Sequence, residues 1–298
     1  MDPPRLHWSR LTLLLLVVGG CRPTAPHPLP EDLPWLPLRR VSVRVGEIAL
    51  PHAAVLVGWR FPGRDSLDQQ HLDFGALDTG LFGIPIKRML PDSSDAAVYR
   101  GRIAALGNRD DSTNALPRSL RPDIGTLGVA RLETRIAILD FPGGRAAVLP
   151  PGQPLPPGVE ARTAFVPLRY VAGRVFIELR IGGEGLNTFV DIGSGLAPLL
   201  LTPERWARLT GRDGRGSTIE LPADGRPLRL ERAPLPGPLA LGGERLRPAH
   251  ASTVRSGPEG SDIARWPGSP EAVAGPELFA DRVIVVDIRG RRFGLLRR

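Results

Sequence analysis

An all-β protein built from two similar halves is the fold that the sequence predicts. Apolar residues alternate with polar ones in short runs separated by glycine and proline, as in strands joined by tight turns. A single segment, residues 202–209, has the pattern of a helix. The order glycine, arginine, apolar strand, aspartate, glycine and arginine occurs twice at identical offsets, in residues 128–145 and 275–292. The repeat indicates that one ancestral unit was duplicated.

The first residues are expected to be a secretory signal and not part of the fold. Arg5 and Arg10 precede the apolar run 11–18, which is too short to serve as a permanent membrane span. Two glycines then precede Cys21, as in a bacterial lipobox, where the cysteine is acylated and becomes the new N-terminus. We therefore predict a lipoprotein signal peptide over residues 1–20. The alternative is an ordinary signal peptide in which the cysteine is incidental.

The residues after the signal predict where the protein resides. Arg22, not aspartate, follows Cys21, which in Gram-negative lipoproteins favours release to the outer membrane. We expect a lipid-anchored protein of the bacterial cell envelope, at the outer membrane and facing the periplasm, that contacts the membrane through its acyl chains only. Residues 21–40 are rich in proline and predict an extended tether.

The charge of the chain excludes one class of partner. Net charge is +8, carried almost entirely by arginine. The arginines are scattered and are not interleaved with aromatic residues, whereas nucleic-acid-binding proteins gather basic residues on one face or in one motif. We therefore expect no nucleic-acid partner, and we expect the protein to be a monomer.

Residues 41–149 are expected to form the N-terminal lobe. Strands are predicted over residues 41–45, 53–59, 74–78 and 136–140, because each is apolar or alternates with period two. The third of these strands ends in an Asp-Thr-Gly turn, and the fourth ends in a Pro-Gly-Gly turn.

A proline-rich linker and a second lobe follow. Residues 150–164 predict a stiff linker without helix, because closely spaced prolines remove backbone donors. Residues 165–298 are expected to form the C-terminal lobe. Its clearest element is a hairpin, in which strands over residues 175–181 and 187–191 flank a glycine-rich turn.

Capping residues mark the ends of several predicted elements. Thr202 is the expected N-cap of the helix, with Pro203 at its first position. Trp206 on this helix is expected to contact the core. Asp140 and Asp287 precede glycine turns, where an aspartate usually caps the turn.

Each half also carries an Asp-x-Gly turn after an apolar run, at Asp78-Thr79-Gly80 and at Asp191-Ile192-Gly193-Ser194. Apolar-apolar-Gly segments follow downstream, at residues 124–128 and 273–275. This arrangement resembles the pepsin/retropepsin aspartic peptidase superfamily, and the resemblance covers both halves. It implies two retropepsin-like β-barrel lobes related by pseudo-twofold symmetry, with a cleft between them and the two Asp-x-Gly loops meeting on the axis.

The resemblance implies that Asp78 and Asp191 are the catalytic pair. The loop residues that it implies around them are Thr79, Gly80, Gly193 and Ser194. Two carboxylates held about 3 Å apart cannot both ionise, so they share one proton. The ionised carboxylate takes a proton from a water molecule, which attacks a peptide carbonyl that the neutral carboxyl group polarises. This chemistry uses no metal and no cofactor, and we expect neither.

The resemblance also has implications for the residue after each aspartate and for a flap over the cleft. The residue after each catalytic aspartate is usually Thr or Ser, whose hydroxyl bonds the opposite loop; Thr79 can make this bond and Ile192 cannot. A possible hairpin over residues 99–107 is the candidate for a flap, with Tyr99 nearest the substrate. The alternative for this segment is a plain surface hairpin.

Two functions fit the pattern. The first is an aspartic-type peptidase that hydrolyses a peptide or protein substrate with water activated by the Asp pair. The second is a catalytically inactive retropepsin-like binding or scaffold lipoprotein. The presence of two aspartates favours the first function, and Ile192 favours the second.

Overall fold

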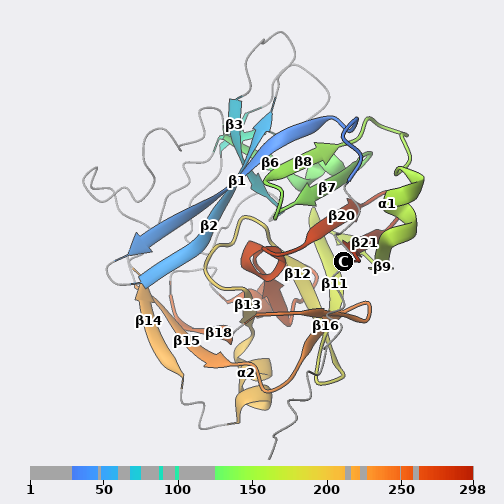
Figure 1. Ribbon diagram of the computed structural model, residues 1–298. Coiled ribbons are helices and arrows are strands. Elements are labelled where there is room, and N and C mark those ends of the chain that lie inside the picture. Colours follow the sequence, from blue (N-terminus) through green and yellow to red (C-terminus); the bar gives the residue numbers. More distant parts are fainter. Residues whose placement is uncertain are drawn as a thin grey trace, which may run out of the picture.

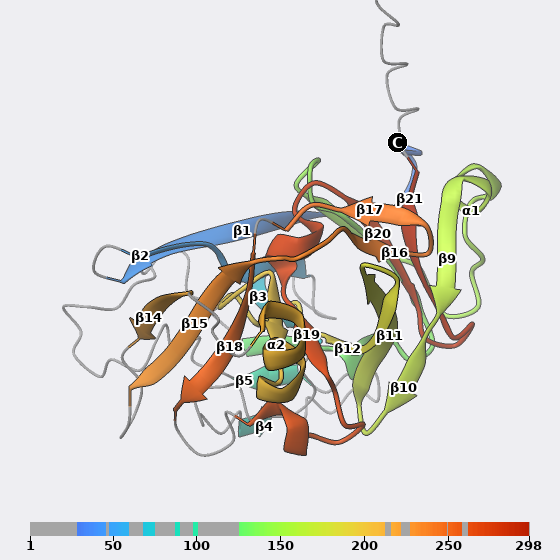
Figure 2. The ribbon, with the colours of Figure 1, turned by 90° about the horizontal axis from the view of Figure 1, so that it is seen from below.

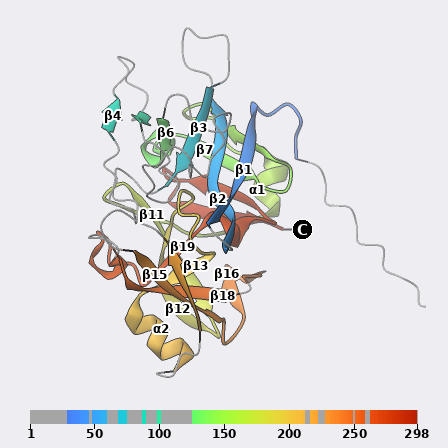
Figure 3. The same cartoon turned by 90° about the vertical axis from the view of Figure 1, so that its left-hand side faces the viewer.

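The structure is a computed structural model that describes residues 29–45, 48–59, 68–74, 87–89, 98–100, 125–211, 216–221, 227–248, 250–257 and 262–297. Within these ranges the chain is almost entirely β-structure, with two α-helices and three short 3-10 helices. The strands form two large sheets that lie one above the other in Figures 1 and 3. The expected all-β fold is confirmed.

Eleven of the described strands form the first sheet, which joins the two halves of the chain. In spatial order they are β4 (Lys87–Met89), β5 (Val98–Arg100), β6 (Gly125–Gly128), β3 (Asp68–Asp73), β2 (Ile48–Trp59), β1 (Trp35–Val45), β8 (Arg145–Val148), β7 (Ile136–Asp140), β20 (Val283–Asp287), β21 (Arg292–Leu296) and β9 (Thr163–Pro167). The last three strands belong to the second half, so this sheet is continuous across the junction of the halves.

The second sheet is built from the second half alone. Its described strands are β14 (Ser217–Leu221), β15 (Leu228–Pro234), β18 (His250–Ser256), β13 (Leu199–Leu201), β19 (Ala272–Ala274), β12 (Glu184–Val190), β11 (Arg174–Ile181), β16 (Leu239–Leu241) and β17 (Glu244–Leu246), with β10 (Arg169–Val171) paired to β11. Helix α2 (Pro203–Thr210) packs against β13 and β18 and lies in front of this sheet in the view from below (Figure 2).

The local signals for the helix and the hairpin of the second half are confirmed. The backbone N–H of Arg205 donates to Thr202 Oγ1 at 3.3 Å, which caps α2, and Trp206 is only 1 % exposed. Strands β11 and β12 pair antiparallel on either side of Gly182 and Gly183. Both glycines have positive φ, at 58° and 94°, as a two-residue hairpin turn requires.

The linker differs from its prediction. Helix α1 (Pro157–Arg162) forms inside the proline-rich segment that was expected to contain no helix, so that expectation was wrong. The reason is position: Pro157 occupies the first turn of the helix, where a backbone N–H has no intrahelical partner and where the fixed φ of proline suits the helix.

Strands β7 and β20 reveal the symmetry between the halves. They lie side by side and pair antiparallel, with Asp140 opposite Val283. Asp287, the counterpart of Asp140 in the sequence repeat, lies opposite Ile136, the counterpart of Val283. The pairing is therefore symmetric about its centre, and a pseudo-twofold axis passes through this pair of strands.

The turns after these two strands are the same. Asp140 Oδ1 accepts from the backbone N–H of Gly143 at 2.8 Å, and Oδ2 accepts from Arg145 Nε at 3.0 Å. Asp287 accepts the same two hydrogen bonds, each at 2.8 Å, from the glycine and the arginine three and five positions later. The expected turn-capping role of both aspartates is confirmed.

Strand β3 lies just before the strand that the sequence predicted over residues 74–78. It ends at Asp73, and Phe74 follows it outside the strand, whereas residues 75–78 lie outside the described residues. Phe74 is fully buried in the largest apolar cluster, which also contains residues of the second half such as Ile192 and Phe279. The core therefore extends across both halves. No helix in the described ranges is long and apolar enough to cross a membrane.

Candidate functional site

The strand registers identify which residues of the two halves correspond. In the second half, β12 runs parallel to β19, and its last residue, Val190, lies opposite Ala274. In the first half, β3 runs parallel to β6, with Leu72 opposite Leu127. Leu127 and Ala274 are counterparts, because each precedes the glycine that opens a copy of the sequence repeat. Leu72 therefore corresponds to Val190.

The residue after each of these positions is an aspartate. Asp73 follows Leu72, and Asp191 follows Val190. Their carboxyl groups share a hydrogen bond. The two loops are so close that a Cβ on Gly193 would lie 2.5 Å from Asp73 Cγ, so only glycine fits there without displacing the carboxylate. The structure thus brings together one aspartate from each half.

Asp191 is held in place by its own loop. Its backbone N–H donates to the carbonyl oxygen of Ala274 at 2.9 Å, which extends the parallel ladder by one bond. The backbone N–H of Gly193 donates to Asp191 Oδ1 at 3.0 Å. The residue is 9 % exposed, so the carboxylate is oriented by fixed backbone donors in a largely dry environment.

The segment after β19 passes against the Asp191 loop. A Cβ on Gly275 would lie 2.6 Å from the carbonyl oxygen of Ser194 and closer still to that of Ala197. Gly275 donates its N–H to the carbonyl oxygen of Pro198 at 3.1 Å. This close approach explains the glycine of the apolar-apolar-Gly segment, because any side chain here would push the Asp191 loop away.

Opposing effects set the protonation of the pair. Burial raises the pKa of Asp191 above its ordinary value. The hydrogen bond with Asp73, the backbone hydrogen bonds from Gly193 and Ser194, and the positive charge of Arg174 act in the opposite direction and do not cancel the rise. A raised pKa in one member and a hydrogen bond between the two members are what a pair that shares a proton requires.

The aspartate that the structure describes beside Asp191 is Asp73, whereas the sequence motif suggested Asp78. Asp78, Thr79 and Gly80 lie outside the described residues, as does Cys21. The carboxylate that is hydrogen-bonded to Asp191 belongs to Asp73, five positions earlier. The signal that could have identified it is the run Leu72-Asp73-Phe74-Gly75-Ala76, which is also an apolar residue followed by Asp-x-Gly and a small residue.

The other expected site residues have mixed outcomes. Gly193 lies against Asp73, and the Ser194 backbone reaches the Asp191 carboxylate. Tyr99 lies in β5, which pairs with β4 on one side and with β6 on the other. Arg88 lies opposite Tyr99 in this ladder, and β6 on the other side of β5 also pairs with β3, the strand that carries Asp73. Residues 101–107 of the proposed flap lie outside the described residues.

The positions after the two aspartates are apolar in both loops. Phe74 follows Asp73, Ile192 follows Asp191, and both side chains are 0 % exposed within the same apolar cluster. Neither can donate a hydrogen bond to the opposite loop. Apolar packing, and not a pair of hydroxyls, therefore stabilises the meeting of these two loops.

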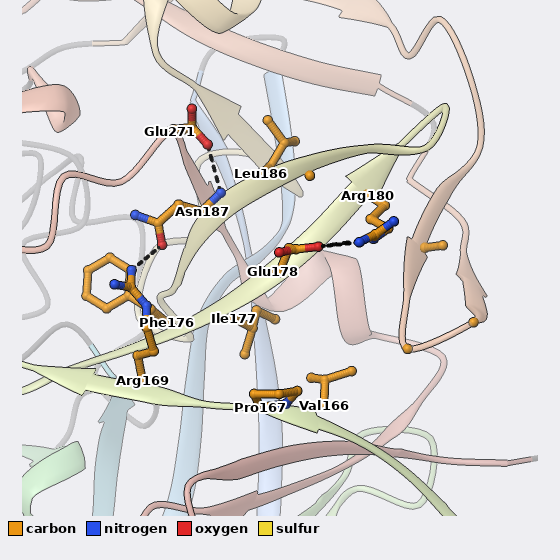
Figure 4. Close-up of a pocket in the computed structure, with 14 residues that line it drawn as sticks. Val166, Pro167, Arg169, Phe176, Ile177, Glu178, Arg180, Leu186, Asn187 and Glu271 are labelled. Carbon is orange, nitrogen blue, oxygen red and sulfur yellow. Dashed lines mark hydrogen bonds and ion pairs between the residues drawn. The ribbon is translucent and has the colours of Figure 1, made fainter.

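A separate pocket of about 800 Å³ lies along the β11–β12 hairpin (Figure 4). Its charged and amide groups bond one another: Arg169 Nη2 donates to Asn187 Oδ1 at 2.6 Å, and Arg180 Nη2 donates to Glu178 Oε1 at 2.8 Å. Neither Asp73 nor Asp191 lines this pocket. In the described part of the chain no group of three or more potential metal ligands is gathered in one place.

Comparison with known proteins gives distant structural matches only. The chain is similar to an aspartic proteinase from Irpex lacteus, at 13 % identity and a TM-score of 0.40, over 88 % of this chain and 96 % of that one. It is also similar to basic 7S globulin from soybean, at 10 % identity and a TM-score of 0.39, over 88 % and 94 %. Conglutin gamma from lupine seeds matches at 10 % identity and 0.40, over 89 % and 94 %. No family model and no curated protein matches the sequence.

Proposed function

We propose that this protein is an aspartic peptidase whose catalytic pair is Asp73 and Asp191. The observation that supports the proposal is the hydrogen bond between these two carboxyl groups. They come from opposite halves of a duplicated chain and follow strands of matching register. A buried pair of carboxyl groups of this kind can hold one proton between them, which is the starting state for acid–base hydrolysis.

Each carboxyl group has a separate role in the proposed reaction. The ionised group accepts a proton from a water molecule as its oxygen attacks the peptide carbonyl carbon. The protonated group donates a hydrogen bond to the carbonyl oxygen and stabilises the negative charge that develops there. Proton transfer to the amide nitrogen then allows the C–N bond to break. The N–H of Gly193 keeps Asp191 oriented throughout these steps.

The experiment that tests this function is cleavage of a peptide library by the purified protein and by single Asp→Asn variants. Asp73→Asn and Asp191→Asn should each lower kcat/KM by 10²-fold or more, because neither carboxyl group can replace the other. Asp78→Asn is the matched variant that separates the two assignments of the first aspartate. It should retain activity, since the proposed catalytic pair is completed by Asp73, whose carboxyl group is hydrogen-bonded to Asp191.

Unchanged circular dichroism and melting temperature in all three variants would show that any loss of activity is chemical. A protein inactivated by Asp78→Asn but not by Asp73→Asn would overturn the assignment of Asp73. Cleavage that survives both Asp73→Asn and Asp191→Asn would remove the peptidase proposal.

A second candidate function is a non-catalytic binding protein that retains the two loops. The observation that favours it is the apolar residue after each aspartate, Phe74 and Ile192. Peptide binding by the wild-type protein without cleavage at any pH between acidic and neutral would decide for this function.

The proposed setting of either function is the bacterial cell envelope. We propose acylation at Cys21, anchoring at the outer membrane and a peptide or protein partner in the periplasm. The proline-rich residues that follow Cys21 support this proposal, because they provide a tether between the anchor and the first strand.

A further inference from the structure

Arg174, the first residue of β11, is the cation next to the Asp pair. The terminal pair of the β11–β12 ladder is Val175 with Val190, so Arg174 and Asp191 are the next residues outward on neighbouring strands. The negative charges of Asp191 and Asp73 both act on the Arg174 guanidinium, against a lowering of its pKa by burial. The guanidinium therefore lies within electrostatic reach of both carboxyl groups.

In the described part of the chain, aromatic rings are the neighbours of this guanidinium. Its central carbon lies 5.9 Å from the ring centre of Phe189 and 6.0 Å from that of Trp266. Its Nε is buried and has no hydrogen-bond partner in the described ranges. Asp73 and Asp191 act on it through charge, without a hydrogen bond.

Two other partly buried arginines, Arg145 and Arg292, are arranged differently. Arg145 pairs with Asp140 at 3.0 Å, and Arg292 pairs with Asp287 at 2.8 Å. In both cases the carboxylate comes from the protein itself. In the described part of the chain the guanidinium of Arg174 interacts with the carboxylates of Asp73 and Asp191 through charge and not through a hydrogen bond. It adjoins the strand end that presents Asp191, past which a substrate of the Asp pair must move.

The equivalent position beside Asp73 is apolar. Leu56 lies opposite His71 in the β2–β3 ladder, so continuing this register by two residues places Ala54 beside Asp73. Ala54 is buried. Among the described residues that the two ladders place beside the pair, the positive charge therefore lies next to Asp191 and not next to Asp73, and it can distinguish the two sides of a bound peptide.

We infer that Arg174 binds a carboxylate group of the substrate immediately beside the bond that the Asp pair cleaves. The inference rests on the proposed function and specifies its substrate class as peptides with an acidic group at the scissile bond. A guanidinium has five N–H donors and binds a carboxylate through two parallel hydrogen bonds. The source of the carboxylate is a Glu or Asp side chain or the C-terminus of the peptide.

The charges at the site are compatible with such a substrate. A pair that shares one proton carries one negative charge, and Arg174 carries one positive charge close to it. The guanidinium therefore offsets the repulsion between the pair and an incoming carboxylate. The substrate carboxylate in turn accepts hydrogen bonds from the N–H groups of the guanidinium.

The test compares peptides that differ only in Glu versus Gln at each position beside the scissile bond, and peptides with a free or an amidated C-terminus. The wild-type kcat/KM should be about tenfold or more higher for the carboxylate form at one position, because a charged hydrogen bond is lost in the amide. This ratio should fall to about one in Arg174→Gln. In Arg174→Glu the preference should change to a peptide with Lys at the same position.

Arg169→Gln is the matched control. Arg169 also lies over an aromatic ring, with its guanidinium carbon 5.5 Å from the ring centre of Phe176, but it is hydrogen-bonded to Asn187. This variant should keep the wild-type ratio. Equal kcat/KM for all Glu and Gln peptides in the wild type, or an unchanged ratio in Arg174→Gln, overturns the inference.

A binding measurement separates this inference from the proposed function. Fluorescence anisotropy with labelled Glu and Gln peptides is carried out on the Asp73→Asn protein, which retains Arg174. Tighter binding of the Glu peptide that disappears when Arg174→Gln is added supports the inference even if no peptide is cleaved by the wild type. Equal binding of both peptides with measurable cleavage by the wild type rejects Arg174 and leaves the peptidase intact.

Discussion

His71 is a buried ionisable residue of β3, two positions before Asp73. Burial lowers its pKa from 6.5 to about 4, and its Nε2 has no hydrogen-bond partner in the described ranges. The folded protein therefore holds His71 neutral, whereas the unfolded chain protonates it below about pH 6.5. Between these values the unfolded state binds more protons, so stability falls as the pH is lowered from 6.5 to 4.

The second half has a phenylalanine at the position that corresponds to His71, namely Phe189. We expect His71→Phe to reduce the loss of stability in acid. Because His71 is protonated in the unfolded chain and stays neutral in the folded protein, it alone should lower the free energy of unfolding by about 3 kcal/mol between pH 7 and pH 4. Each unit of pKa shift is worth about 1.4 kcal/mol. Urea denaturation at pH 7, 5.5 and 4 measures this loss for the wild type and the variant.

His250→Phe serves as the control, because His250 is only partly buried, whereas His71 is buried. Its pH dependence should stay close to that of the wild type. An identical loss of stability with pH in the wild type and His71→Phe would show that His71 is not held neutral.

At the scale of the element, the sequence predicts structure well where the signal is local and poorly where the structure depends on long-range strand pairing. The β11–β12 hairpin and α2 could be predicted, because a glycine turn and a Thr-Pro cap lie within the segments that they define. The sequence left the first aspartate of the pair ambiguous, because Asp-x-Gly occurs at both Asp73 and Asp78, and the parallel pairing of β3 with β6 is what places Asp73 at the position that corresponds to Asp191. That pairing brings Leu72 to Leu127, which is far away in sequence.

A motif search favours Asp78 for a chemical reason. Thr79 provides the hydroxyl that is usual after the catalytic aspartate, whereas Phe74 after Asp73 does not. The register of β3 is instead fixed by which side chains enter the core, and Phe74 is fully buried there. Helix α1 was not predicted because its segment is rich in proline. A helix nevertheless tolerates proline in its first turn, where Pro157 lies.

The duplicated turns permit a prediction about an element. A Cβ on Gly290 would lie 2.7 Å from Asp287 Cγ, so Gly290→Ala must displace the carboxylate that accepts from Arg292. We expect a loss of about 1–3 kcal/mol, the cost of breaking charged hydrogen bonds at a buried group. Gly158→Ala is the control, because Gly158 lies in α1 and a Cβ there meets nothing within 4 Å.

Chemical denaturation of both variants checks this prediction. Gly158→Ala should be neutral or stabilising by up to about 1 kcal/mol, because alanine is the better helix former. Equal effects of the two substitutions would mean that the Asp287 turn does not depend on its glycine.

At the scale of the whole molecule, the two halves are joined by a shared sheet. Strand β7 of the first half pairs with β20 of the second, and Ile138 lies opposite Val285 at the centre of this pairing. Both side chains are 0 % exposed and belong to one apolar cluster. The hydrogen-bonded pair of Asp73 and Asp191 depends on the relative position of the halves, so this junction supports the candidate site from a distance.

Ile138→Ala should therefore destabilise both halves together. The substitution leaves a cavity at the pseudo-twofold axis, and the expected cost is about 2–5 kcal/mol. Hydrogen exchange read by mass spectrometry should show faster exchange in β3 and in β12, the strands that carry Asp73 and precede Asp191, by similar factors. Ile219→Ala is the control, because Ile219 lies in β14 at the edge of the second sheet, and its effect should be confined to β14 and β15. Faster exchange in one half only would mean that the halves unfold independently. The shared sheet would then not maintain the relative position of Asp73 and Asp191.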